Sequence, residues 1–209
     1  MWWEYLVVGA VGYFVGAIPS GLLVGRWRKR VDVRQYGSGK SGFTNVLRII
    51  GPGASVLVLV ADIAKGAVPV ILARAISDSS YVQAFGGLLA VVGHNWPVYV
   101  NFRGGRGVAT SYGAGLAMAP IVALILLIAS GLVIALTRYM SLMSMISAVV
   151  GAAALVILAL LGVEPFAYLV YGILAAVLII FQHRDNIQRL LAGKEPKIGQ
   201  RVEVSGQEP

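Results

Sequence analysis

The sequence predicts an all-α integral membrane protein with about seven transmembrane helices, its N-terminus outside and its C-terminus in the cytoplasm. The chain of 209 residues is 58% hydrophobic and only 12% charged, which is too apolar for an ordinary soluble domain. Its apolar residues form long stretches separated by polar loops. Of its 17 Lys and Arg residues, all but Lys65 and Arg74 fall in loops that seven spans place on one side. The positive-inside rule assigns that side to the cytoplasm.

Seven apolar stretches are the expected spans. In chain order they are about residues 5–24, 54–76, 81–92, 108–118, 120–136, 142–162 and 166–181. A bilayer core needs roughly 20 apolar residues per helix, so the first, second and sixth stretches are long enough by themselves. The third reaches full length only if it continues toward His94. The fourth and fifth are either two spans or one helix bent at Pro120, so five or six spans are the alternatives to seven.

The chain is interpreted as one membrane domain, residues 1–201, followed by a polar tail, residues 202–209, that is expected to be disordered. The first apolar stretch is not interpreted as a cleaved signal peptide, because its basic run follows it. The net charge of +8 lies in loops between spans, so nucleic acid is not an expected partner. The absence of cysteine excludes thiol nucleophiles and thiolate metal sites.

A Gly-Ser-Gly turn lies in the long loop between the first two spans. It is not a P-loop, because Arg34 stands where that pattern requires glycine. Such a turn can bare backbone N–H groups as an anion nest, and nearby hydroxyl, amide and guanidinium groups add donors. The residues expected to contact a phosphate here are Gly37, Ser38, Gly39, Thr44, Asn45 and Arg48. The alternative is an interfacial turn whose basic residues bind lipid headgroups.

A second glycine-rich loop precedes the helix expected to begin at Val108. A glycine turn that leads into a helix N-terminus favours anions, because unpaired N–H groups and the helix dipole point toward the ligand. The residues of this expected phosphate site are Arg103, Gly104, Gly105, Arg106 and Gly107. The alternative is a loop whose arginines only set the membrane topology.

The remaining polar residues near the spans are few. His94 and His183 lie near cytoplasmic ends of spans, with no Cys or Glu at ligand spacing, so no metal site is expected. Asp62 and Lys65 lie three residues apart on one helix face, either as an ion pair that fixes helix packing or as functional groups. Ser141 and Ser144 place two hydroxyls at the start of the sixth span. Their default role is interhelical hydrogen bonding.

Taken in order, these motifs closely resemble the bacterial acyl-phosphate:glycerol-3-phosphate acyltransferase family, PlsY. The resemblance covers nearly the whole chain through residues 16–21, 37–48, 62–66, 93–98, 102–110, 137–141 and 183–187. Lys40 and Phe43 replace the family's usual Asn and Ala, and Arg103 and Arg106 replace its common Lys. These arginines keep the charge, although their planar fork differs from the point charge of Lys. Lys40 either adds a phosphate contact or faces solvent.

The resemblance implies an enzyme of phospholipid synthesis in the bacterial cell membrane, with its site on the cytoplasmic face. It would move a fatty acyl group from acyl phosphate to the 1-hydroxyl of glycerol 3-phosphate, giving lysophosphatidic acid and phosphate, with no cofactor. The implied catalytic residues are Ser38, Arg48, Ser141, Ser144, His183 and Asn186. The implied supporting residues are Asp62, Lys65 and His94. A soluble enzyme that produces the unstable donor is a further expected partner, beside membrane lipid.

The chemistry follows from the substrates that the resemblance implies. An acyl phosphate is an activated mixed anhydride, so no covalent intermediate is required. The glycine loops and the arginines would offset the repulsion between two anions. Either His183 or a substrate phosphate would accept the hydroxyl proton, and the phosphate is favoured because no acidic partner for His183 is evident.

Two other classes of protein compete with this interpretation. A small organic-anion transporter also uses basic glycine loops at broken helices, but it predicts inverted repeats and polar residues near the middle of the membrane. The sequence shows no such repeat, and its polar motifs gather at one face. A non-catalytic lipid-binding scaffold would leave the ordered set of motifs unexplained.

Overall fold

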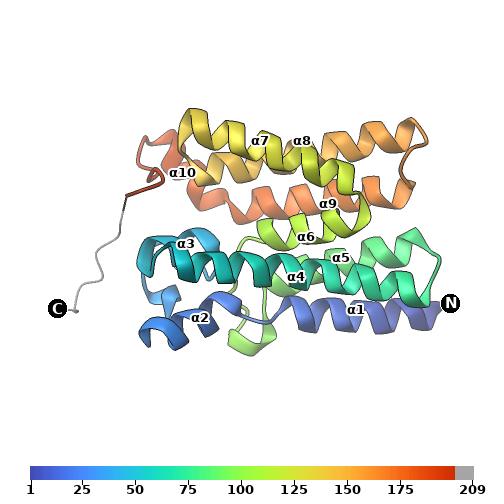
Figure 1. The fold of residues 1–209 in the computed structure, drawn as a ribbon, viewed down its shortest axis with the longest axis horizontal. Helices are drawn as coiled ribbons and strands as arrows, with labels where there is room; N and C mark the ends of the chain where they lie inside the picture. Colours follow the sequence, from blue (N-terminus) through green and yellow to red (C-terminus); the bar gives the residue numbers. More distant parts are fainter. Residues whose placement is uncertain (201–209) are drawn as a thin grey trace.

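Helices make up all of the regular secondary structure in residues 1–200, the part of the chain that the computed structural model describes (Figure 1). The α-helices are α1 (Trp2–Gly16), α2 (Ser20–Lys29), α3 (Phe43–Ile49), α4 (Pro52–Ile76), α5 (Ser80–Asn95), α6 (Val108–Met118), α7 (Pro120–Thr137), α8 (Met140–Leu160), α9 (Phe166–Gln182) and α10 (Arg184–Leu191). Two short 3₁₀ helices are η1 (Val33–Gln35) and η2 (Val98–Val100). The all-helical prediction is therefore confirmed for these residues, and the predicted tail, 202–209, lies outside them.

Each of the seven apolar stretches contains a helix, as the hydropathy pattern predicts. Four helical segments are long and apolar enough to cross a membrane, namely Trp2–Lys29, α4, α7 and α8. A fifth is added if α9 and α10, which are bent by 58° at their junction, form one broken span. The helices α5 and α6 have 16 and 11 residues, so their length alone does not make them spans. A count of seven spans remains a prediction.

Proline explains where two of the apolar stretches break. Pro19 directly precedes α2, and Pro120 occupies the first turn of α7, where its missing N–H would have no helical partner. The fourth and fifth stretches are therefore two helices separated at Ala119, and the single bent helix considered from the sequence is not formed. In Figure 1, α6 lies between α4 on one side and the group of α7, α8 and α9 on the other.

Glycine allows α4 and α6 to pack backbone against backbone. Gly66 of α4 lies against the carbonyl oxygen of Thr110, and Gly113 of α6 lies against that of Ile63. A Cβ atom at either glycine would overlap that oxygen, so only glycine permits this approach. The contact fixes the first turn of α6 beside the middle of α4.

The loops that carry the sequence motifs lie away from the N-terminal end of the bundle. Figure 1 shows α2, α3 and α10 at the left end, whereas the N-terminus lies at the right end. The second glycine-rich loop and the start of α6 lie further into the bundle (Figure 1). Several of the segments that carry motifs therefore gather toward the end of the bundle opposite the N-terminus.

Candidate active site

A pocket of about 250 Å³ brings together segments that are far apart in the sequence. Its polar lining comes from the first loop and α3, from α4 and α5, from the second glycine loop, from α7 and α8, and from the turn after α9. These polar residues are Ser38, Lys40, Thr44, Asn45, Asp62, His94, Arg106, Ser130, Ser144 and His183. Its apolar lining includes Phe43, Leu59, Ile63, Leu127 and Met143. The pocket therefore joins a cationic region to a hydrocarbon-like region.

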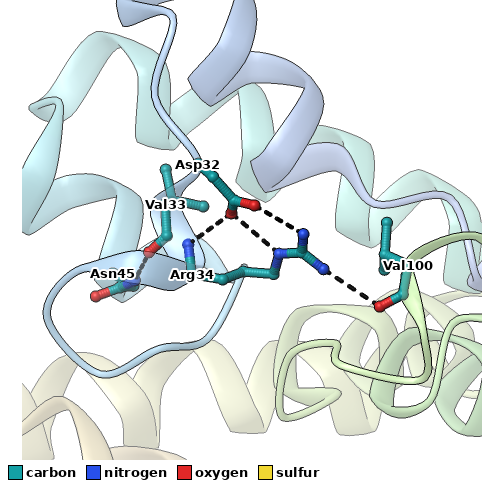
Figure 2. Close-up of polar contacts among 5 residues, drawn as sticks. All are labelled: Asp32, Val33, Arg34, Asn45 and Val100. Carbon is teal, nitrogen blue, oxygen red and sulfur yellow. Dashed lines mark hydrogen bonds and ion pairs between the residues drawn. The ribbon is translucent and has the colours of Figure 1, made fainter.

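The buried amide of Asn45 organises the first loop. Its Nδ2 donates to the carbonyl oxygens of Val33, Tyr36 and Lys40 at 2.8, 3.1 and 2.8 Å, and Figure 2 shows the bond to Val33. Its Oδ1 accepts the backbone N–H of Ser38 at 3.0 Å. The side chain, only 2% exposed, is thus committed to the loop backbone. Asn45 shapes the loop that presents Ser38 and Lys40.

The hydrogen bonds of this loop differ from those of the expected anion nest. Gly37 and Gly39 both have positive φ angles, 60° and 68°, as such a turn requires. However, the N–H of Ser38 is bound by Asn45, and the N–H of Gly39 donates to the carbonyl of Tyr36 at 3.1 Å. Side chains, rather than these two N–H groups, provide the polar surface of the loop toward the pocket.

Arg34 fastens the first loop to the second. Its guanidinium forms an ion pair with Asp32, with Nη2 and Oδ2 2.7 Å apart, and its Nη1 donates to the carbonyl of Val100 at 3.2 Å (Figure 2). Val100 belongs to η2, which leads into the second glycine loop. Arg34 is thereby a structural residue that holds the two phosphate-binding candidates next to each other.

The second glycine loop rests on His94 and ends at the N-terminus of α6. The N–H of Gly105 donates to the carbonyl of His94 at 3.1 Å, and a Cβ atom at Gly105 would overlap His94 Nε2. Gly107 caps α6 with a φ of 79°, and Gly107, Val108 and Ala109 line the pocket. The positive end of the helix dipole therefore faces the pocket, as the sequence predicts.

Arg106 is the most distinctive cation of the pocket. Its Nε is buried without a hydrogen-bond partner, and no carboxylate forms an ion pair with it among residues 1–200. Burial, with a further contribution from the charge of Arg189, lowers the pKa of Arg106 to about 10. The group is still charged at neutral pH, and a buried charge without a partner is costly. An anionic ligand in the pocket would supply the missing partner.

Lys40 adds a second cation to the same pocket. Of the two positions considered for it, contact with the pocket is the one observed, because its side chain is about half-buried there. Burial and, secondarily, the charge of Arg106 lower the pKa of the Lys40 ammonium. The two cations stand close enough to repel one another, which again favours a bound anion.

His183 presents one ring nitrogen to the pocket from the turn between α9 and α10. The side chain is buried, and its Nδ1 lies 2.8 Å from the carbonyl oxygen of Ile179. Because a carbonyl only accepts hydrogen bonds, Nδ1 carries the proton of the neutral ring and Nε2 is left as an acceptor. A substrate hydroxyl could donate to that Nε2.

Asp62 is the centre of a buried polar cluster at the base of the pocket. Its Oδ1 lies 2.9 Å from Lys65 Nζ and 3.6 Å from His94 Nδ1, and it accepts a hydrogen bond from Ser20. Lys65 also donates to the carbonyl of Ile18 at 2.9 Å. The ion pair expected from the sequence is therefore present, and it joins the break between α1 and α2 to α4 and α5.

The structure separates the two serines at the start of α8. Ser144 lines the pocket, although its hydroxyl donates to the carbonyl of Met140 at 2.8 Å. Ser141 is buried but does not line the pocket, and its hydroxyl lies near Glu195 without forming a hydrogen bond in the described residues. Asn186 likewise lies beside the pocket and donates to Glu195 Oε1 at 2.7 Å. Of these three residues, Ser144 is the one in position to contact a ligand.

Glu195 is a site-supporting residue that the sequence interpretation missed. Its side chain accepts from Asn186 and, at 2.7 Å, from Arg189 Nε. Burial acts to raise the pKa of Glu195, but the hydroxyl of Ser141 and the bonds from Asn186 and Arg189 outweigh it, so the pKa lies below its usual value. The only sequence signal was an acidic residue within a basic segment. Glu195 holds Asn186 and Arg189 around the end of α9.

Two of the expected phosphate-binding arginines lie outside the pocket. Arg48 lines a neighbouring cavity of about 410 Å³ together with Thr44, and its Nη2 donates to the carbonyl of Pro196 at 3.2 Å. Arg103 is exposed beside the second glycine loop. Because Thr44 and Met140 line both cavities, Arg48 stands one residue layer away from the main pocket.

The described residues show no metal-binding cluster. Nowhere in residues 1–200 do three or more His, Asp or Glu side chains come together as ligands for one ion. The pocket contains two cations, hydroxyl groups and a helix N-terminus, which suit an organic phosphate, and its one carboxylate, that of Asp62, is already paired with Lys65.

A family model described as glycerol-3-phosphate acyltransferase matches residues 6–193 of this chain. The chain belongs to the glycerol-3-phosphate acyltransferase family. It is therefore an acyltransferase and an integral membrane protein, and the anion transporter is not favoured. Two similar curated relatives are the glycerol-3-phosphate acyltransferases of Synechococcus elongatus and Rubrobacter xylanophilus. The first is 40% identical over 208 residues (96% of this chain and 97% of the relative), and the second is 43% identical over 198 residues (95% and 96%).

Two crystal structures of PlsY, an integral membrane glycerol 3-phosphate acyltransferase, have the same fold. The glycerol 3-phosphate form matches with a TM-score of 0.86 at 36% identity, covering 93% of this chain and 96% of that one. The lysophosphatidic acid form matches with a TM-score of 0.84 at 36% identity, covering 93% and 95%. The family resemblance inferred from the motifs is confirmed.

Arg106→Ala should weaken the binding of an organic phosphate, because the pocket loses a partly buried guanidinium whose Nε has no hydrogen-bond partner among residues 1–200. Hydrogen bonds to charged groups contribute about 1.5–3 kcal/mol, which corresponds to roughly a tenfold to hundredfold rise in the dissociation constant. Titration calorimetry with glycerol 3-phosphate in lipid nanodiscs would measure it. Arg103→Ala is the matched control, since it removes an exposed arginine from the same loop. Equal losses in both variants would contradict the assignment of Arg106.

Proposed function

We propose that this protein transfers a fatty acyl group from acyl phosphate to the 1-hydroxyl of glycerol 3-phosphate. The products would be lysophosphatidic acid and inorganic phosphate, and the reaction would be the first acylation of phospholipid synthesis. The observation that carries this proposal is Arg106, a partly buried arginine whose Nε is buried without a hydrogen-bond partner among residues 1–200. It is set just before the N-terminus of α6 and in the same pocket as His183. The pocket continues into an apolar region, as a substrate with a phosphate and a fatty chain requires.

The reaction needs positioning more than activation. The glycerol hydroxyl oxygen attacks the acyl carbonyl carbon, the bond from that carbon to the phosphate oxygen breaks, and the phosphate leaves with the electron pair. Arg106, Lys40 and the first turn of α6 surround the place where negative charge gathers. They would draw two anions together and stabilise the leaving phosphate.

His183 and the leaving phosphate are the two candidate acceptors of the hydroxyl proton. Nδ1 of His183 is bonded to the carbonyl of Ile179 rather than to a carboxylate, so no acidic group stabilises an imidazolium there. This supports the phosphate as the final proton acceptor. His183 Nε2 would then accept a hydrogen bond from the hydroxyl and aim its oxygen at the acyl carbon.

The apolar side of the pocket supports a fatty acyl donor. Leu59 and Ile63 of α4, together with Leu127 of α7, line it. Leu127 is 60% exposed on the surface of the bundle, so this side reaches the position that lipid chains would occupy. A chain could enter from the bilayer while its phosphate remains at Arg106.

The membrane orientation and location are part of the proposal. Seven spans with an outside N-terminus put the phosphate pocket at the cytoplasmic face of the bacterial cell membrane, where glycerol 3-phosphate would be available. The basic residues that end α2, which are exposed, support this orientation. Because the chain has no cysteine, Asp78→Cys and Trp27→Cys each introduce a single thiol for a reagent that does not cross the membrane. We expect labelling from outside the cell at position 78 and not at position 27. Labelling at position 27 but not at position 78 would reverse the orientation.

The docking of a soluble enzyme that makes acyl phosphate also remains a proposal. Its basis is chemical, because a mixed anhydride hydrolyses in water. Direct delivery from the enzyme that makes it would reduce this loss of donor. Delivery would appear as faster product formation from donor made in situ than from free donor at the same concentration. Equal rates would argue against docking.

Purified protein in lipid should form lysophosphatidic acid from palmitoyl phosphate and glycerol 3-phosphate. The donor anhydride is already activated, and the phosphate pocket has no evident place for a large carrier. Palmitoyl-coenzyme A and palmitoyl-acyl carrier protein are the control donors. Product from those donors would still support an acyltransferase but would contradict acyl phosphate as its specific donor. Vesicle uptake of glycerol 3-phosphate without any product would favour the transporter.

His183→Ala should lower kcat by about 10²–10⁴-fold, the usual range for a group that handles a reacting proton, while the protein still folds. The pH profile of kcat/KM distinguishes its two roles. If His183 only positions the hydroxyl, the acidic limb of the profile survives in His183→Asn at a reduced rate. If His183 is the base, that limb disappears. An unchanged kcat in His183→Ala would remove both roles.

A further inference from the structure

A second cavity, of about 80 Å³, continues inward from the candidate active site. It lies among α6, α7, α8 and α9, whereas the apolar side described above opens between α4 and α7. The two cavities share four lining residues, Val108, Tyr112, Ser130 and Ser144. An apolar group that starts at the phosphate pocket can therefore extend in this direction without leaving the protein.

The serines along this inner cavity are already paired within the protein. Ser130 and Ser147 share a hydrogen bond of 2.8 Å between their hydroxyls, and Ser111 lies 3.1 Å from the hydroxyl of Tyr171. Tyr171 also donates to the carbonyl of Ser111 at 2.9 Å. The hydroxyl of Ser144 is bound to its own helix. With these groups satisfied, the cavity suits an apolar ligand rather than a polar one.

Small residues keep the inner cavity open. Gly115, Gly151, Ala152, Gly172, Ala175 and Ala176 all line it. A Cβ atom at Gly151 would lie 3.2 Å from both methyl carbons of Leu126, and one at Gly172 would lie 2.8 Å from Leu155 Cδ1. A larger side chain at Gly151 would therefore crowd Leu126 and narrow the cavity between α7 and α8. Close-packed interiors contain few voids larger than a water molecule.

We propose that the inner cavity receives the end of the fatty acyl chain, and that Gly151 and Leu155 set the longest chain the enzyme uses well. This inference rests on the proposed acyl transfer. The cavity is too small for a whole chain and holds only its last few methylene groups. Chains that end before the cavity leave it empty, chains that fill it gain affinity, and longer chains must turn aside toward the bilayer.

The test is the specificity constant for decanoyl, dodecanoyl, palmitoyl and stearoyl phosphate, measured with glycerol 3-phosphate saturating in lipid nanodiscs. Burial of one methylene changes affinity about fourfold. Gly151→Leu crowds Leu126 and narrows the cavity, so kcat/KM for the longest well-used donor should fall about tenfold or more relative to decanoyl phosphate. Leu155→Ala enlarges the inner cavity and should move the preference toward longer donors. This second variant keeps the test decisive if Gly151→Leu does not fold.

Gly131→Leu is the matched control. Gly131 lies on α7 and is exposed, and no atom lies within 4 Å of an added Cβ, so the length profile should be that of the unaltered enzyme. A uniform loss across all donors in Gly151→Leu, or an unchanged profile in Leu155→Ala, would overturn the inference. No turnover of any acyl phosphate by the unaltered protein would instead refute the proposed function.

Discussion

The buried carboxylate of Asp62 is the interaction on which the rest of the site depends. A charge at this depth is tolerated only when it is paired. Asp62 forms an ion pair with Lys65 and accepts a hydrogen bond from Ser20, while His94 Nδ1 packs beside it at 3.6 Å. These partners come from α4, α2 and α5, so the cluster fixes three helices at the base of the pocket. The backbone carbonyl of His94 accepts a hydrogen bond from the N–H of Gly105, and its ring packs against the same glycine. The position of Arg106 is thus set by a network that starts at Asp62.

The other cations near the pocket show how Arg106 differs from them. Arg34 is paired with Asp32, and Arg189 is paired with Glu195, so each has its counter-charge within the protein. Arg48 is held by a backbone carbonyl beside a separate cavity. Arg106 and Lys40 both line the main pocket, and neither has an anionic partner in the described part of the chain. Arg106 differs from Lys40 in that its Nε is buried without a hydrogen-bond partner. We propose that these two cations are left for an anionic ligand.

Local sequence patterns predict most of the fold, because span length and proline position are local properties. Each apolar stretch forms a helix, and the break before Pro120 follows from its missing donor. The motifs also predict much of the pocket, including Ser38, Arg106 and His183. Three-dimensional packing decides the rest, such as the use of Asn45 within its own loop. The partnership of Asn186 with Glu195 depends on how the chain turns after α10, which no local pattern records.

Acyl transfer at a membrane surface needs water at one end of its substrate and hydrocarbon at the other. In the proposed function the start of α6 would supply phosphate-binding groups, while its following turns line the inner cavity. One short helix would therefore set the distance between the phosphate and the chain end. Its backbone contact with α4 at Gly66 and Gly113 keeps that distance fixed. If the acyl chain occupies the inner cavity, chain-length preference follows from the rigidity of α6 against α4 as much as from the size of the residues at the end.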